Sequence, residues 1–140
     1  MLAVDQAAKA LVRARVPYGG TARLMGVGLH HTHNAGLFGG GLPGAAVPAG
    51  VLTAAGIAVA LVLYARRPAL PRGQALAAGL LLGGATGNLA DRLRLGYVTD
   101  FVARGDRNAF NLADLAIYVA IGLFLLLTFR RDGPATPPGA

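Results

Sequence analysis

The segment Leu112–Phe129, LADLAIYVAIGLFLLLTF, decides the fold class, because it is an almost unbroken run of apolar residues. A transmembrane helix needs about 20 such residues, with a usual range of about 17–25. Two further runs meet this requirement, at 49–65 and 74–90. The chain is 54% apolar and only 14% charged, whereas an ordinary soluble domain is about 25% charged. These features predict an all-α membrane protein, with three complete transmembrane helices in a single membrane-embedded domain, 1–131.

The segments outside the three runs have a different composition. Residues 1–15 are helical in character, with Asp5 and Lys9 one turn apart in the favourable order, but their first charge comes too early for a transmembrane helix. Residues 16–48 are rich in Gly and Pro, and they include an alternation of apolar residues with Gly that is typical of a short strand. We therefore predict a small β-rich cap at one membrane face, and a disordered tail at 132–140.

The residue types that the chain lacks exclude several kinds of catalysis. It has no Cys, Ser or Glu, which excludes a thiol nucleophile, a Ser–His pair and the metalloprotease motif H-E-x-x-H. The net charge of +7 comes from Arg residues scattered between apolar runs. Since these residues form no basic patch with interleaved aromatic residues, we expect no nucleic-acid partner.

Three histidines lie close together in the sequence HHTH, at His30, His31 and His33. Strand alternation would place only His31 and His33 on one face, and the sequence offers no second cluster of ligands. We therefore expect no metal site and interpret the three residues as polar surface.

The polar residues gather at one membrane face if the three spans alternate in direction. All but one of the six acidic residues, and every Asn and His, then lie on the side of residues 1–48 and 91–111. Asn88, Asp91 and Arg92 share one helix face by their spacing. Asp114 lies among apolar residues at the start of the third span. An ionisable residue in such a segment costs free energy, which makes it a candidate for a functional site.

Each acidic residue also has a structural interpretation when it is considered alone. Asp91 and Arg92 could form an interfacial ion pair, Asp114 could cap the N-terminus of its helix, and Asp100 could be a turn residue in VTDF. Judged singly, none of them identifies an enzyme.

Taken together, five short blocks resemble the motifs of the signal peptidase II family, the lipoprotein signal peptidases. The blocks occur in the family's order, over about residues 5–125: DQAAK (5–9), HNAGLFGG (33–40), GGATGNLADR (83–92), GYVTDF (96–101) and FNLAD (110–114). Five blocks in this order are a far more specific signal than any one of them.

The resemblance implies an aspartic endopeptidase of the bacterial cytoplasmic membrane, active near the extracytoplasmic face. Enzymes of this family remove signal peptides from prolipoproteins, cutting just before the diacylglyceryl-modified cysteine, and need no cofactor. We expect prolipoproteins and membrane lipids as partners, and a monomer. By resemblance, the catalytic pair is Asp100 and Asp114. Residues that match substrate-binding or supporting positions are Asp5, Lys9, Asn34, Gly36, Asn88, Asp91, Arg92 and Asn111.

The chemistry of two neighbouring carboxyl groups agrees with this assignment. Two carboxylates close together cannot both ionise cheaply, so they share one proton. The ionised member can take a proton from water while the protonated member donates to the scissile carbonyl. We expect Asp100 on a loop and Asp114 at a helix start, so residues 101–113 must fold back, with a turn at Gly105 and residues 106–108.

The chain departs from the family pattern in three ways. The family has four spanning helices, so 1–15 corresponds only to the outer end of the first, and we expect a mis-assigned start codon or a truncated chain. More cations fall on the proposed outer side than the positive-inside rule favours. An aromatic residue of the family's dyad loop is replaced by Asn108-Ala109, which suggests a different substrate preference.

Two other functions are compatible with parts of the pattern. A non-catalytic membrane scaffold, or a degenerate paralogue, would bind lipoprotein precursors without cutting them. A transporter would use the intramembrane Asp residues as proton carriers, but three spans are few for that role and the Asp residues cluster at one face.

Overall fold

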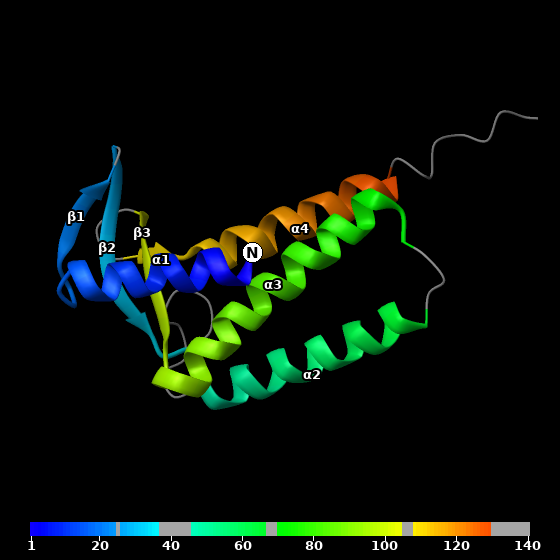
Figure 1. Ribbon diagram of the computed structural model, residues 1–140, viewed down its shortest axis with the longest axis horizontal. Coiled ribbons are helices and arrows are strands. Elements are labelled where there is room, and N and C mark those ends of the chain that lie inside the picture. Colours follow the sequence, from blue (N-terminus) through cyan, green and yellow to red (C-terminus); the bar gives the residue numbers. More distant parts are fainter. Residues whose placement is uncertain (25, 37–45, 67–69, 105–107, 130–140) are drawn as a thin grey trace, which may run out of the picture.

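The computed structural model describes residues 1–24, 26–36, 46–66, 70–104 and 108–129. Within these ranges the chain forms four helices and a four-stranded sheet, and Figure 1 shows α2, α3 and α4 extending away from the sheet. The helices are α1 (Leu2–Arg15), α2 (Ala46–Ala65), α3 (Arg72–Leu95) and α4 (Leu112–Phe129). The strands are β1 (Thr21–Leu24), β2 (Val27–Asn34), β3 (Val98–Arg104) and β4 (Asn108–Phe110).

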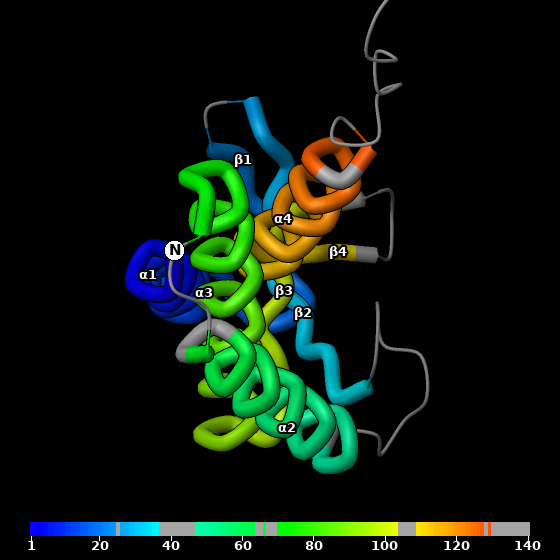
Figure 2. Tube along the Cα trace, turned by 90° about the vertical axis from the view of Figure 1, so that its right-hand side faces the viewer, coloured from blue at the N-terminus to red at the C-terminus, as the bar shows by residue number. Residues whose placement is uncertain are grey.

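Helix α3 is the central element of the helical part. It contacts α1, α2 and α4, which surround it in the view of Figure 2. The helix extends to Leu95, past the expected end of the second span at residue 90, and stops at Gly96. Gly96 has φ 78° and its N–H donates to Arg92 O at 3.0 Å, a left-handed cap that favours glycine. The chain then turns directly into β3.

The sheet is antiparallel throughout, in the order β1-β2-β3-β4. Its central pair places Asn34 opposite Val98 and Thr32 opposite Asp100. One prediction is therefore wrong: Asp100 lies in a strand instead of a loop, because the segment after Gly96 pairs along β2. The predicted fold class is correct in part. The expected β-rich region at 16–48 supplies β1 and β2, but the fold is mixed helix and sheet instead of all-α, since β3 and β4 come from the segment expected to be a loop.

Helices α1 and α3 run in the same direction, and successive turns of α1 pack against successive turns of α3. A Cβ on Gly83 would meet Met1 Cβ at 2.9 Å, and a Cβ on Gly87 would meet Asp5 Oδ2 at 2.7 Å. On the other side of α3, a Cβ on Gly84 would meet Ala113 O of α4 at 2.6 Å. The glycines therefore allow α3 to approach both neighbours closely, as small residues do in membrane helix bundles.

A small apolar core joins α1 to the sheet. Val12 and Val16 pack with Phe101 of β3, so the end of α1 is fixed against the strand that carries Asp100. The outer faces of α2 and α4 are apolar instead: Leu52 is 68% exposed and Phe129 is 72% exposed. Exposed apolar faces of this kind indicate contact with a membrane or a protein partner.

Among the residues that the structure describes, no helix has both the length and the apolarity needed to cross a membrane. The three transmembrane helices remain a prediction. The expected tail at 132–140, the end of the HNAGLFGG block and the turn at Gly105 lie outside the described residues.

Candidate active site

Asp100 is held in the middle of the molecule by two side-chain amides. It lies on β3 and is only 2% exposed. Asn111 Nδ2 donates to its Oδ1 at 2.6 Å, and Asn34 Nδ2 donates to its Oδ2 at 3.1 Å. Both oxygens of this carboxyl group therefore accept a hydrogen bond.

Asp114 lies in the first turn of α4 and takes part in a capping box. Asn111 Oδ1 accepts the Asp114 N–H at 2.9 Å, and the Asn111 N–H points back to Asp114 Oδ2 at 3.4 Å. This reciprocal arrangement satisfies two N–H groups at the start of the helix. Asn88 Nδ2 of α3 donates to Asp114 Oδ1 at 2.8 Å. The helix-cap interpretation of Asp114 is thus correct in part, since Asn111 is the cap residue and Asp114 its partner.

Asn111 brings the two carboxyl groups to one place, because it contacts both. Burial and the negative charge of Asp114 raise the pKa of Asp100 to about 6, against the opposing effects of the Asn111 and Asn34 hydrogen bonds and of Lys9. Desolvation disfavours the charged form of a carboxyl group, and a neighbouring carboxylate has the same effect. Near pH 6 the Asp100 side chain therefore occurs in both protonation states.

A second polar cluster lies behind Asn88 and is fully enclosed. The Lys9 ammonium contacts Asp5 Oδ2 at 2.9 Å, Asp91 Oδ2 at 3.2 Å and Asn88 Oδ1 at 2.9 Å. Lys9 and Asp5 are 0% exposed. Asp5 also accepts the Ala113 N–H at 2.9 Å, so it satisfies another N–H group at the start of α4. Buried charges need such partners to be tolerated.

Arg92 and Gly36 connect α3 to the end of β2. Arg92 Nη2 donates to Gly36 O at 3.3 Å, and Arg92 Nη1 donates to Asn88 O at 3.4 Å. The Gly36 N–H donates to Asn34 Oδ1 at 3.1 Å. The interpretation of Asp91 and Arg92 as an ion pair is wrong, because the ion-pair partner of Asp91 is Lys9.

Three contributors were not singled out from the sequence. Gln6 Nε2 donates to Asp91 Oδ1 and to Gly87 O, both at 3.1 Å. Thr99 is fully buried and donates its N–H to Asp91 Oδ2 at 3.0 Å, while its hydroxyl accepts from Arg13. Gln6 lies inside the DQAAK block, so the motif itself carried the signal. Thr99 lies inside the GYVTDF block in the same way, whereas nothing in the local sequence marked Arg13.

The histidine cluster differs from its interpretation as polar surface. His31 is 5% exposed and its Nδ1 lies 2.7 Å from Val16 O. His31 and His33 do share one face, with ring centroids 5.3 Å apart, and His33 stacks on Tyr97 at 3.6 Å. Burial, with the neighbouring charges of His31 and Arg13, lowers the pKa of His33. The interpretation as surface is therefore wrong for His31, which packs under Tyr18.

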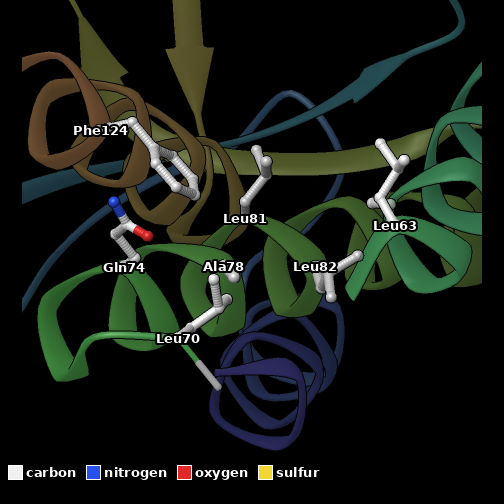
Figure 3. Close-up of a pocket in the computed structure, with 8 residues that line it drawn as sticks. Leu63, Leu70, Gln74, Ala78, Leu81, Leu82 and Phe124 are labelled. Carbon is white, nitrogen blue, oxygen red and sulfur yellow. The ribbon is translucent and has the colours of Figure 1, made fainter. Parts of the chain in front are cut away.

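An apolar cavity of about 360 Å³ lies away from this site, between α2, α3 and α4 (Figure 3). Phe124, which lines it, follows Asp114 by ten residues on α4, a rise of about 15 Å along the helix. The cavity is therefore separate from the two carboxyl groups. Its lining is Ala60, Leu63, Leu70, Gln74, Ala78, Leu81, Leu82 and Phe124.

Comparison with known proteins identifies the family of this chain. The family model described as Signal peptidase (SPase) II matches residues 1–130. The chain belongs to the signal peptidase II family. The motif blocks therefore match a real relationship, and the buried polar residues around Asp100 and Asp114 are those that the blocks contain.

Individual relatives agree with this membership. A lipoprotein signal peptidase of Moorella thermoacetica is 36% identical over 144 residues, covering 99% of this chain and 92% of the relative. One from Dehalococcoides mccartyi is 46% identical over 76 residues, 51% of this chain and 48% of the relative. With the Dehalococcoides mccartyi relatives the match thus spans about half of their length.

Solved structures share the fold of this signal peptidase II family member. One described as a bacterial membrane enzyme determined by the in meso method superposes with a TM-score of 0.87 at 20% identity, covering 99% of this chain and 88% of the other. A second structure with the same description gives a TM-score of 0.81 at 22% identity, covering 94% and 88%. At these identities the comparison concerns the fold alone.

Proposed function

We propose that this chain is an aspartic endopeptidase of the bacterial cytoplasmic membrane that removes signal peptides from prolipoproteins. One observation carries the proposal: Asp100 and Asp114, from a strand and a helix, converge on Asn111 and both accept its hydrogen bonds. The family membership supplies the substrate class, since its members are named as lipoprotein signal peptidases. The cut falls before the diacylglyceryl-modified cysteine.

The two carboxyl groups have different tasks in this proposal. Asp100 is the more enclosed, and its pKa of about 6 makes it the member that carries the shared proton. Asp114 is half-buried at the helix start and acts as the carboxylate. This division follows the general rule that environments which separate two carboxyl groups define the acid and the base.

Cleavage then proceeds without a covalent intermediate. Asp114 takes a proton from water, and the oxygen of that water attacks the carbonyl carbon of the scissile peptide. Asp100 donates its proton to the carbonyl oxygen, which gives a neutral gem-diol. On collapse of the gem-diol, Asp114 returns a proton to the leaving nitrogen, Asp100 regains a proton from a hydroxyl, and the C–N bond breaks. General acid–base help of this kind contributes about 10²–10⁴-fold for each group.

The other polar residues of the site position this pair. Asn34, Asn88 and Asn111 donate to the carboxyl groups, and Arg92 of α3 supports them by donating to Gly36 O just after β2. Asp5, Lys9 and Asp91 form the enclosed cluster that ties α1 to α3 and α4. The site lies at the sheet end of the helices, which we assign to the extracytoplasmic face. The exposed apolar faces of α2 and α4 support a place in the membrane.

The experiment is prolipoprotein processing by the purified protein in detergent micelles. Asp100→Asn and Asp114→Asn should each abolish cleavage, because either change removes one member of the acid–base pair, while binding of the prolipoprotein survives. Asp132→Asn serves as the matched control, since Asp132 lies after all the motif blocks, and it should cleave like the wild type.

Two outcomes would contradict the proposal. Normal cleavage by either Asp100→Asn or Asp114→Asn would remove the carboxyl pair from the mechanism. Binding without cleavage by the wild-type protein, in conditions where a related signal peptidase II cuts the same substrate, would favour a non-catalytic scaffold.

A further inference from the structure

The enclosed Lys9 ammonium has all of its hydrogen-bond capacity in use. Its partners are oxygens of Asp5, Asp91 and Asn88, at 2.9, 3.2 and 2.9 Å. An ammonium group has three donors and no acceptor. Lys9 can therefore contact the Asn88 side chain only through its oxygen, Oδ1.

This contact sets the direction of the Asn88 amide. The oxygen and nitrogen of an Asn side chain have nearly the same shape, so a hydrogen-bond network must decide which is which. With Oδ1 facing Lys9, Nδ2 faces Asp114 and donates to its Oδ1 at 2.8 Å. The Lys9 ammonium on α1 thereby directs the Asn88 Nδ2 donor toward the Asp114 carboxyl group on α4.

The two other amides around the pair are directed differently. Asn34 Oδ1 accepts the Gly36 N–H, and Asn111 Oδ1 accepts the Asp114 N–H. Because backbone N–H groups can only donate, both residues must present Nδ2 to Asp100. Of these three amides, Asn88 is the one whose direction depends on a side chain, and so on a residue that can be replaced.

We propose that Lys9 is a positioning residue for the carboxyl pair: by fixing the Asn88 amide it keeps Asp114 a hydrogen-bond acceptor and leaves the shared proton on Asp100. This inference rests on the proposed function and deepens it. If the amide were reversed, Asn88 Oδ1 would face Asp114, and only a protonated Asp114 could bond to it. The proton would then sit on the wrong partner for the attack of water.

The charged groups that face Asp114 from the packed elements must be counted in any test. They are Asp100 on β3 and Arg92 on α3, with Lys9 of α1 one residue further away, behind Asn88. A change at Lys9 alters both the amide direction and the local charge. The experiment therefore needs a background in which the amide is absent.

The sequence offers a clean chemical comparison, because the chain has no Cys. In Lys9→Cys the only thiol is at position 9, and alkylation of the unfolded chain with 2-bromoethylamine, followed by refolding in detergent, restores an ammonium on a side chain of similar length. The two forms differ in the group at position 9, which faces Asn88 and also Asp5 and Asp91. Circular dichroism and thermal unfolding establish that both are folded.

The readout shows which carboxyl group carries the proton. It is the infrared carbonyl stretch of a protonated carboxylic acid, recorded at about pH 5, which is below the pKa of Asp100. In the wild-type and alkylated proteins, this band should disappear on Asp100→Asn. In the unalkylated protein it should disappear on Asp114→Asn instead, and prolipoprotein cleavage should fall about a hundredfold and recover on alkylation. A band that depends on Asp100 in both forms would overturn the proposal.

A second variant separates the effect of the Asn88 amide direction from the effect of the charge at position 9. In Asn88→Leu, alkylation at position 9 should no longer move the band, since the amide route is gone. If alkylation still moved it, a direct effect of the charge would replace the proposed route. Should unalkylated Lys9→Cys not fold, Asn88→Leu in the Lys9 chain tests the same step: the band should shift toward Asp114, and an unchanged band would refute the role of the amide. Cleavage by Asp100→Asn in the Lys9 chain would refute the proposed function separately.

Discussion

Asn111 donates its side-chain N–H to Asp100 at 2.6 Å, the shortest hydrogen bond described at the site, and the same residue directly precedes helix α4. One side chain thus performs a structural task, capping the helix through Oδ1, and a chemical task, holding Asp100 through Nδ2. The two tasks use different atoms, so substitution can separate them.

Replacing Asn111 by Ser should preserve the helix and lose the chemistry. A Ser hydroxyl can still accept the Asp114 N–H, but it is too short to reach Asp100. Asn111→Ala should lose both tasks and cost about 0.5–2 kcal/mol of stability. Thermal unfolding and prolipoprotein cleavage, measured on both variants, should show Ser near wild type in stability and both far below it in rate. A Ser variant with wild-type cleavage would contradict the role of Nδ2.

Cleavage should be lost as pH rises through about 6. Asp100 must carry its proton to act as the acid, and its pKa is raised to about 6, so the rate should fall about tenfold per pH unit above that value. Asn34→Leu removes a donor that favours the ionised form, which raises the pKa further and moves the alkaline limb to higher pH. Rate profiles from pH 4 to 9 test this, with the exposed Arg23→Gln as control. A limb that moves to lower pH would exclude Asp100 as the acid.

Asp100 should also make the fold less stable at neutral pH than in mild acid. Its folded pKa is raised, so its contribution to stability is fully present below the unfolded pKa near 4 and is lost as pH rises through about 6. Asp100→Asn cannot titrate, so the stability of the variant relative to wild type should rise by about 2–3 kcal/mol between pH 4 and 7. Thermal unfolding of both proteins across this range measures the change. A difference that stays constant with pH would show that Asp100 titrates alike in both states.

Two alanine substitutions on α3 should have opposite effects. In Gly87→Ala the new Cβ would lie 2.7 Å from Asp5 Oδ2, so the enclosed cluster must shift, at a cost of about 1–3 kcal/mol. Gly79 has open space at this position, and Gly79→Ala should instead stabilise the helix by about 0.4–1 kcal/mol. Thermal unfolding of the two variants compares them directly. Equal effects would mean that the close approach of α1 to α3 is not needed.

The sequence predicted the helices better than the sheet, for a physical reason. Long apolar runs indicate α3 and α4 locally, although they placed the end of α3 at residue 90 instead of Leu95. Strands β3 and β4 have no such local pattern, because Asp100 and Thr99 are buried polar residues in the middle of a strand. What places them there is pairing with β2, more than 60 residues earlier in the chain, which no local window contains.

The residues of the candidate site could be predicted from the sequence, but the contacts between them could not. The motif blocks supplied every residue of the carboxyl pair and its amides, because all of these residues lie inside the blocks that resemble the family's motifs. They did not supply the connections: that Lys9 reaches Asn88, or that Asp5 accepts from Ala113, depends on how the helices pack. The burial of His31 was missed for a similar reason, since its Val16 partner lies at the end of α1.

The bond between Asp5 and the Ala113 N–H joins positions 108 residues apart, one in the first helix and the other in the last helix that the structure describes. During synthesis, α1 leaves the ribosome before α4 has been made, so Asp5 cannot form this hydrogen bond until α4 is present. The carboxyl pair cannot be assembled until the last helix has docked. In the proposed mechanism, cleavage therefore becomes possible only after the segment that carries Ala113 and Asp114 has been synthesised and has packed against α1.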